Sequence, residues 1–198
     1  MDIGALIKSG AIEDAETAAT ALRRSASIFN QFDLAFGDGG AWEARLAAVR
    51  TRFGQQLDSF FRTVDRDVEK ALPLASVPLL GKMSRKAPDL TADPDSLVAT
   101  RALAALIIVD GASGLAPLVG AEAARQAAIR AVGERTDRYA DELIDLLPET
   151  RDGEREAATA LAGLAARCLD LTQGPDVGAL VRRRISSAVI DRSEDEAA

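Results

Sequence analysis

Apolar and polar positions alternate with a helical period along most of this chain. The clearest case is the segment 41–72, where large apolar residues recur at every third or fourth position: Trp42, Leu46, Val49, Phe53, Leu57, Phe60, Val64 and Val68. Residues at this spacing lie on one face of an α-helix, with charged side chains between them on the other faces. The row also repeats every eleven residues, so the stripe runs almost straight along the helix. The segment therefore predicts one long helix whose apolar stripe another element must cover.

A second helical pattern precedes the long one. Leu22, Phe29 and Phe36 recur every seven residues with alanines between them, which predicts a helix over 12–36 with a narrow apolar seam. The run Gly37–Gly40 then breaks the chain. We therefore expect an N-terminal helical hairpin in which 12–36 folds against 41–72.

The second half of the chain predicts four further helices. Residues 97–109 are apolar nearly all round, as in a buried helix, and Asp93 followed by Pro94 is typical of a helix start. Three more helices are expected: one from 117 or 120 to about 147, one from 149 to about 171, and one that carries the apolar face at Val177, Val181, Ile185 and Ala188. The acidic residues 192–198 are expected to form a frayed tail.

Residues 73–95 do not show the helical pattern of the rest of the chain. Prolines interrupt this segment, and basic residues cluster in it. We expect a proline-rich basic connector, a loop with one short helix near 77–84, and a place suited to partner contact. No pair of strands is expected. The run 106–109 is strand-like, but the sequence offers it no second strand.

Together these patterns predict an all-α fold, a helical bundle of five to seven helices with a long N-terminal hairpin. A chain of 198 residues is long enough to bury a core and favours a single domain over 1–198. Aromatic residues make up only 4% of the chain while alanine is frequent, which favours closely packed helices over a sheet.

Charge and residue usage exclude several functions. A formal net charge of −7 argues against general nucleic-acid binding. One cysteine and no histidine exclude an intramolecular disulfide, Ser-His-Asp or Cys-His catalysis, and a Cys/His zinc site within one chain. The N-terminus lacks a signal-peptide pattern and the apolar run 102–109 is too short for a membrane span, so we expect a cytoplasmic location. Nothing in the sequence calls for a cofactor.

Contact with other proteins is the first functional hypothesis: a non-enzymatic accessory or regulatory protein that acts through helix-mediated contacts, with a protein partner or as a homodimer. The reason is the long apolar stripe of segment 41–72, because part of it can remain uncovered by the rest of the chain. Phe61 would mark the interface if it stays exposed in the monomer. The other candidate contact residues are basic: Lys82, Arg85 and Lys86 in the connector, and the consecutive Arg182, Arg183 and Arg184.

Two alternatives remain open. Paired carboxylates could hold Mg²⁺ in an all-α hydrolase of nucleotides or diphosphates, provided that two helical groups converge: Glu13 and Glu16 on one side, and Asp141, Glu142 and Asp145 on the other. Acids are expected near a helix start and on a solvent face in any case. The third hypothesis is a small-molecule binding module with an apolar cavity lined by Phe60, Leu103 and Leu143.

Overall fold

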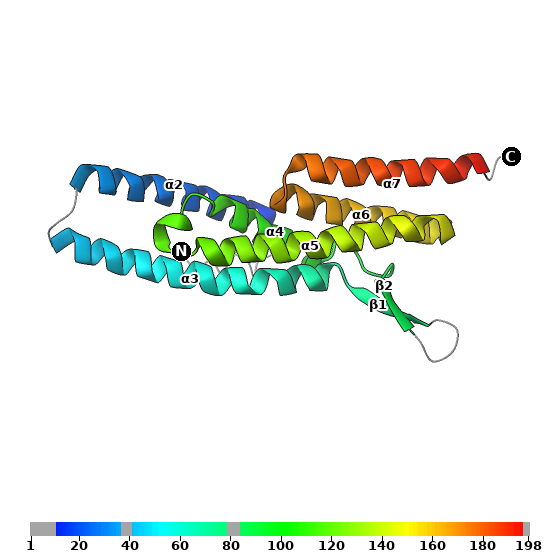
Figure 1. Cartoon of the computed structure of the whole chain (residues 1–198), viewed down its shortest axis with the longest axis horizontal. Coiled ribbons are helices and arrows are strands. Elements are labelled where there is room, and N and C mark those ends of the chain that lie inside the picture. Colours follow the sequence, from blue (N-terminus) through cyan, green and yellow to red (C-terminus); the bar gives the residue numbers. More distant parts are fainter. Residues whose placement is uncertain (1–10, 37–40, 79–83, 196–198) are drawn as a thin grey trace. The chain divides into compact units, whose positions relative to one another are not determined.

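The computed structural model describes residues 11–36, 41–78 and 84–195 (Figure 1). The structure is 81% helical, and its described residues form six α-helices and one two-stranded sheet. The prediction of an all-α fold is therefore confirmed.

The predicted N-terminal hairpin is present with nearly the predicted bounds. Helix α2 (Ile12–Phe36) and helix α3 (Ala41–Ala71) run side by side in opposite directions (Figure 1). Phe29 of α2 meets Phe53 of α3 edge to face, with 6.0 Å between the ring centroids. Both residues belong to the apolar seams that the sequence predicts for the two helices.

The chain divides into two compact units. Unit 1 comprises Met1–Asp67 and Thr100–Ala131, and unit 2 comprises Val68–Ala99 and Val132–Ala198. The boundaries fall inside α3, helix α4 (Leu97–Gly111) and helix α5 (Glu122–Leu146). The single-domain organisation stays a prediction.

In unit 1, helix α4 supplies the buried centre that its sequence predicts, with Ala102–Leu106 buried along its length. Two glycines allow the helix backbones of this unit to approach closely. A Cβ built on Gly111 of α4 would lie 2.5 Å from the Ala19 Cα of α2. A Cβ on Gly54 of α3 would overlap the carbonyl oxygen of Val119, in the 3₁₀ turn Pro117–Val119. Only glycine fits at these positions without moving a neighbouring backbone.

The start of α4 differs from the prediction. Ser96 caps the helix, because its Oγ accepts a hydrogen bond from the Ala99 N–H at 3.3 Å. Asp93 instead accepts from the Asp95 N–H at 2.9 Å, in the turn before the helix. The predicted cap was wrong by one turn, because Asp93 and Pro94 form a turn of their own.

The connector of unit 2 contains a β-hairpin where a loop and a short helix were expected. Strand β1 (Leu74–Pro78) pairs antiparallel with strand β2 (Ser84–Pro88), with Ala75 opposite Ala87. The short helix near 77–84 is wrong at positions 77, 78 and 84, and 79–83 lie outside the described residues. Prolines forbid a helix interior, but both strands of a two-stranded sheet are edges, where proline is tolerated.

Helix α5, helix α6 (Asp152–Thr172) and helix α7 (Pro175–Asp195) supply the remaining helices of unit 2. Gly178 lets α7 lie against α6, because a Cβ there would be 2.5 Å from the Ala166 carbonyl oxygen. Helix α7 reaches Asp195, while 196–198 lie outside the described residues, and the fraying of the tail stays a prediction. Residues 192–195 contain no glycine or proline to end the helix.

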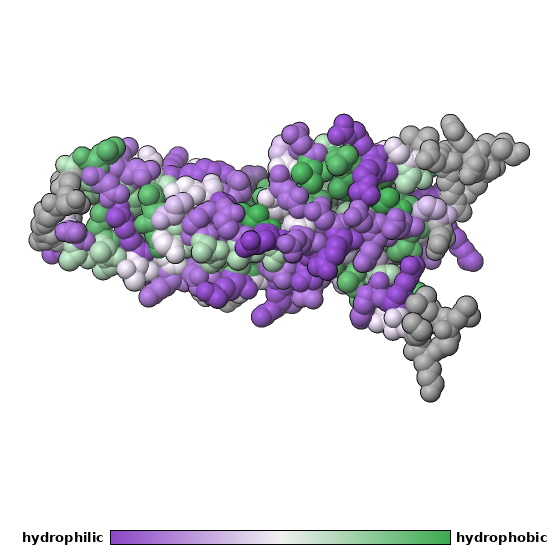
Figure 2. Space-filling model, in the orientation of Figure 1, coloured by the Kyte–Doolittle hydropathy of each residue, from purple (hydrophilic) through white to green (hydrophobic). Residues whose placement is uncertain are grey.

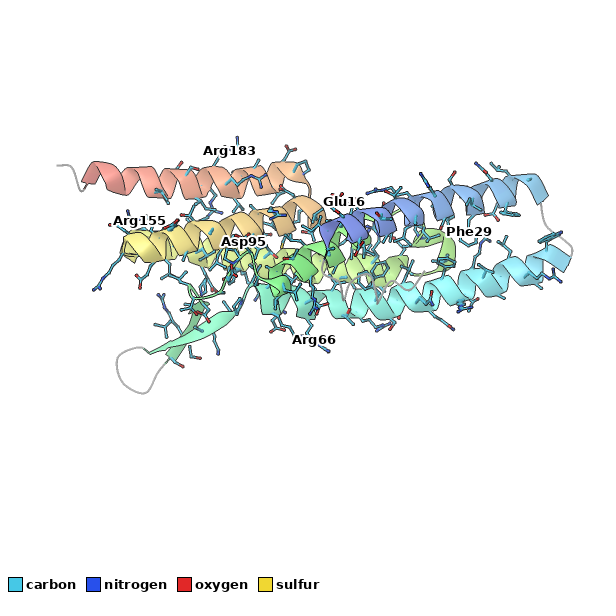
Figure 3. The ribbon with its side chains drawn as sticks, turned by 180° about the vertical axis from the view of Figure 1, so that it is seen from behind. Glu16, Phe29, Arg66, Asp95, Arg155 and Arg183 are labelled. Carbon is cyan, nitrogen blue, oxygen red and sulfur yellow. The ribbon has the colours of Figure 1, made fainter. Side chains whose placement is uncertain are left out.

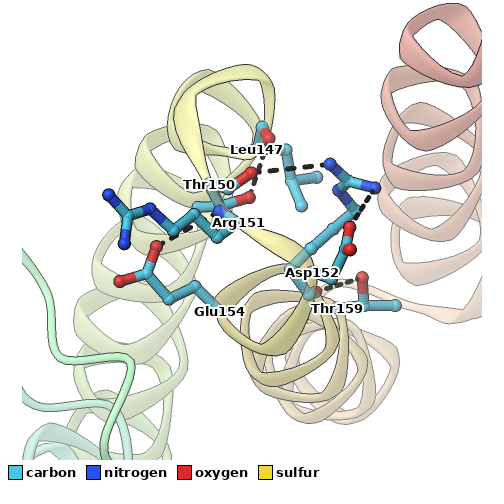
Figure 4. A network of polar contacts seen from close by, with 7 residues as sticks. Leu147, Thr150, Arg151, Asp152, Glu154 and Thr159 are labelled. Atoms are coloured by element: carbon cyan, nitrogen blue, oxygen red, sulfur yellow. Dashed lines mark hydrogen bonds and ion pairs between the residues drawn. The ribbon is translucent and has the colours of Figure 1, made fainter. Parts of the chain in front are cut away.

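A local network starts α6 after the 3₁₀ turn Leu147–Glu149 (Figure 4). The buried Thr150 hydroxyl donates to the Leu147 carbonyl oxygen at 2.8 Å. The Glu154 carboxylate accepts from the Arg151 N–H at 3.2 Å, which satisfies a donor at the helix start. These bonds separate α6 from α5 at the point where Pro148 interrupts the helical pattern.

Candidate interaction groove between helices α2 and α3

A groove of about 840 Å³ lies within unit 1, between the second half of α2 and the first half of α3. Its walls are mostly apolar side chains from both helices: Ile28, Phe29, Phe32, Trp42, Leu46, Val49 and Phe53. Figure 2 shows apolar side chains gathered between the two helices at this end of the hairpin.

The groove exists because the apolar stripe of α3 continues beyond the helices that cover it. In the second half of the stripe, Leu57 and Val64 are fully buried. In the first half, Trp42 is 62% exposed and Val49 is 46% exposed, although both continue the same row at the same spacing. The covering contact of Val119 lies at Gly54, between the two halves.

Helix α2 also has apolar residues that are buried in its first half and exposed in its second half. Ala18 and Leu22 are buried in its first half, whereas Ile28, Phe32 and Leu34 are exposed in its second half. The groove therefore has apolar walls on both sides that are accessible to solvent. Exposed apolar patches bounded by charged residues are typical of interaction sites.

Arg50 links the two walls. Its Nη2 donates to both carboxylate oxygens of Asp33 on α2, at 2.5 and 2.6 Å. The guanidinium carbon also lies 5.5 Å from the ring centroid of Phe29, within range of a cation–π contact. Phe29 points from α2 towards α3 (Figure 3). These contacts join the two walls of the groove within the single chain.

The Arg50 side chain also has a buried donor. Its Nε is buried and has no hydrogen-bond acceptor among the described residues. A buried donor without an acceptor costs about 1–3 kcal/mol.

The carboxylates predicted as metal ligands have basic neighbours instead. Asp141 accepts a hydrogen bond from Arg184 at 2.7 Å. Glu142 and Asp145 line one small hollow together with basic residues of β2, Arg85 and Lys86. Fixed positive charges beside these carboxylates oppose the binding of a further cation.

Glu13 and Glu16 lie in unit 1, exposed at the start of α2, in a shallow hollow that Arg24 also lines. Among the described residues, no group of three or more acids, cysteines or histidines is arranged to hold a metal ion. The magnesium hypothesis thus gains no support from the positions of its residues.

The predicted contact residues divide into three groups. Phe61 is 1% exposed, so the condition for its interface role is not met. It lies beside alanines of α5, where Phe61, Ala124 and Ala128 line one hollow. Position 61 is buried because α3 has neighbours on two sides, which a single stripe does not reveal.

Two of the three consecutive arginines hold α7 in place. Arg182 donates to both carboxylate oxygens of Asp170 on α6, at 2.9 and 3.0 Å, and Arg184 pairs with Asp141 on α5. Arg183 is exposed and points away from α6 (Figure 3). Two of the three arginines thus form ion pairs within unit 2.

The basic residues of the connector are partly accessible. Arg85 and Lys86 are exposed on β2, and the Lys86 Nζ donates to the Ser76 Oγ at 2.8 Å. Lys82 lies outside the described residues.

The hypothesis of a small-molecule cavity stays a prediction for its three apolar residues. Phe60 and Leu103 are buried in unit 1 and Leu143 is buried in unit 2, each as a core side chain. Sequence reasoning missed the groove, although one signal was available. Ile28 and Phe32 make the apolar face of α2 wider than the seam of residues that recur every seven positions. Packing against one neighbouring helix would need only that seam.

Cys168 of α6 is expected to be unreactive in the native protein. Burial raises the pKa of its thiol to about 12, and the thiolate is the reactive form. A thiol reagent at pH 8 should therefore label Cys168 only as fast as the chain unfolds, and rapidly in denaturant. Prompt labelling of the native protein in stoichiometric amount would contradict the burial of this side chain.

None of the protein-family models, curated proteins or solved structures compared with this chain matches it. Among the described helices, none combines the length and apolar character that crossing a bilayer requires.

Proposed function

We propose that this chain is a non-enzymatic accessory protein that acts through helix-mediated contacts, and that the groove between α2 and α3 is its contact surface. The unbroken stripe of α3 carries the proposal, because its buried and exposed halves have the same spacing and residue type. Half of the exposed large apolar side chains among the described residues fall between positions 28 and 49. Full burial of such a side chain contributes up to about 1.5–3 kcal/mol.

A helix is the occupant that fits these walls best. Two helices with apolar faces and a gap between them accept a further helix with an apolar stripe, as in helix-in-groove recognition. A small apolar ligand is the second candidate, since the groove volume of about 840 Å³ falls within the range of ligand pockets. Such pockets bury most of the ligand surface, however, and the accessible walls at Ile28, Trp42 and Val49 favour the larger occupant.

The proposal is tested with Val49→Asp, which places a charge on the groove wall. Val98→Asp is the matched control, since Val98 on α4 lies outside the groove lining and is 41% exposed against 46% for Val49. We expect Val49→Asp to weaken any association of the protein at least tenfold and Val98→Asp to leave it unchanged. The measurement is native mass over a concentration series, with and without candidate partners.

Trp42 reports the state of the groove directly, because it is the only tryptophan in the chain. Association through the groove should shift its fluorescence to shorter wavelengths, as the exposed indole loses water contact. Association that leaves the emission unchanged and responds equally to the two aspartate variants would overturn the proposal.

A further inference from the structure

We propose that the occupant of the groove is an amphipathic helix of another protein, with acidic residues beside its apolar stripe. This inference rests on the proposed function and names the chemistry of the partner. Three exposed arginines that flank the apolar walls carry it: Arg24 on α2, and Arg45 and Arg52 on α3. Arginine and tryptophan are also the residue types that most often dominate binding between proteins.

The two arginines of α3 lie on the same face as the exposed part of its apolar stripe. Arg45 lines the groove, three residues after Trp42 and four before Val49. Arg52 is exposed three residues after Val49 and seven after Arg45, a spacing that places it on the same face. Among the described residues, neither guanidinium has a carboxylate partner. Both can therefore bind a carboxylate from another molecule.

Arg24 extends this basic rim onto α2. It lines a shallow hollow that shares Ser25 and Ile28 with the groove, so the two form one continuous surface along the helix. From Glu13 to Ile28 this surface spans roughly 22 Å, about four turns of a helix. Glu16 lies roughly 12 Å from Arg24 along the helix axis, a separation that exceeds the Debye length of about 8 Å at physiological salt. The acidic end of the hollow therefore does not neutralise Arg24.

The acidic residues of the groove itself lie on the other side of the stripe. Asp33 is bonded to Arg50 within the chain. Glu43 lies seven residues before Arg50 and only two before Arg45, so it shares a helix face with Arg50 and not with Arg45. The segment 41–53 carries three arginines and one glutamate in a chain whose net charge is −7. A basic site on an acidic protein favours an acidic partner.

The shape of the site favours a helix over an anionic bilayer, although both could supply negative charge. The apolar walls belong to a groove of about 840 Å³, and one of its lining residues, Phe29, is only 6% exposed. A helix is a cylinder of roughly 10 Å diameter that can enter such a groove and contact both walls. A flat surface would contact only the rims.

A peptide titration tests the charge of the partner. The acidic probe is a peptide of about 18 residues with leucine at every third and fourth position, glutamate beside the leucines, and alanine and glutamine elsewhere. The basic probe has lysine in place of glutamate. Followed by Trp42 emission, the acidic peptide should bind at least tenfold more tightly than the basic one at low salt. Added salt should reduce the difference, because it screens exposed charges.

Charge reversal tests the arginines of α3. Arg45→Glu/Arg52→Glu should weaken binding of the acidic peptide at least tenfold and strengthen binding of the basic peptide. The matched control is Arg66→Glu/Lys70→Glu, which makes the same change of net charge at exposed positions of α3 outside the groove lining, and it should leave both affinities unchanged. Circular dichroism checks that both double variants keep the helical content of the wild type.

The outcomes separate this inference from the proposed function. If both peptides bind equally and Val49→Asp weakens both, the groove takes a helix but the acidic partner is wrong. Self-association that Val49→Asp removes would make a second copy the occupant, again overturning only this inference. Arginine-dependent binding to vesicles of phosphatidylglycerol and phosphatidylcholine, with neither peptide bound, would assign the groove to a bilayer and overturn both. Absence of binding to any of these probes at concentrations on the order of 1 mM also overturns both.

Discussion

Replacing Phe61 with alanine is expected to lower the free energy of unfolding by about 3–5 kcal/mol, the range for truncating a buried phenylalanine. The side chain is 1% exposed and lies between the second half of α3 and the alanines of α5. Its removal leaves a cavity that the surrounding helices close only in part. Denaturant unfolding monitored by circular dichroism measures the change.

Trp42→Ala provides the control on the same helix. Its side chain is as large, but it is 62% exposed, so truncation should cost less than about 1 kcal/mol of stability in the monomer. The two variants therefore separate the two halves of the stripe, one stabilising the fold and the other available for contact. Equal losses from Phe61→Ala and Trp42→Ala would contradict this division.

Gly111→Ala is the second change with a large expected effect, a destabilisation of about 1–3 kcal/mol. The new Cβ would lie 2.5 Å from the Ala19 Cα, so either α2 or the end of α4 must move. A backbone atom cannot turn away as a flexible side chain can. The thermal midpoint or the free energy of unfolding reports the effect.

Gly163→Ala makes the same substitution where there is room. Gly163 lies inside α6, and no atom outside its own helix is within 4 Å of the added Cβ. Alanine should stabilise this position by about 0.5–1 kcal/mol, because it loses less backbone entropy in a helix. If Gly111→Ala changes the free energy of unfolding no more than Gly163→Ala does, then α2 and α4 do not approach each other as closely as they do in the structure.

The local part of the fold was predictable because helical periodicity is a property of neighbouring residues. The bounds of α2 and α3 agree with the prediction within one residue at each end, since the three-and-four spacing stops at Gly37–Gly40. The β-hairpin was not predictable in the same way. Its strands are five residues each, and their stability comes from pairing between positions such as Ala75 and Ala87.

The candidate site depended on information that periodicity does not contain. The sequence places Trp42, Val49, Leu57 and Val64 in one row and cannot distinguish the buried members from the exposed ones. That distinction depends on where Val119 meets α3 at Gly54. The ion pairs of Arg182 and Arg184 could not be predicted for the same reason. Their carboxylate partners lie twelve and forty-three residues away along the chain.

The sequence by itself determined which segments are helical and which face of each is apolar, because backbone hydrogen bonds and side-chain spacing within a helix involve residues at most four apart. Only the tertiary structure decided how far α4 and α5 cover the hairpin, and so which apolar residues remain at the surface. That outcome depends on packing between distant residues, which forms only where helix lengths and small residues such as Gly54 and Gly111 permit close approach.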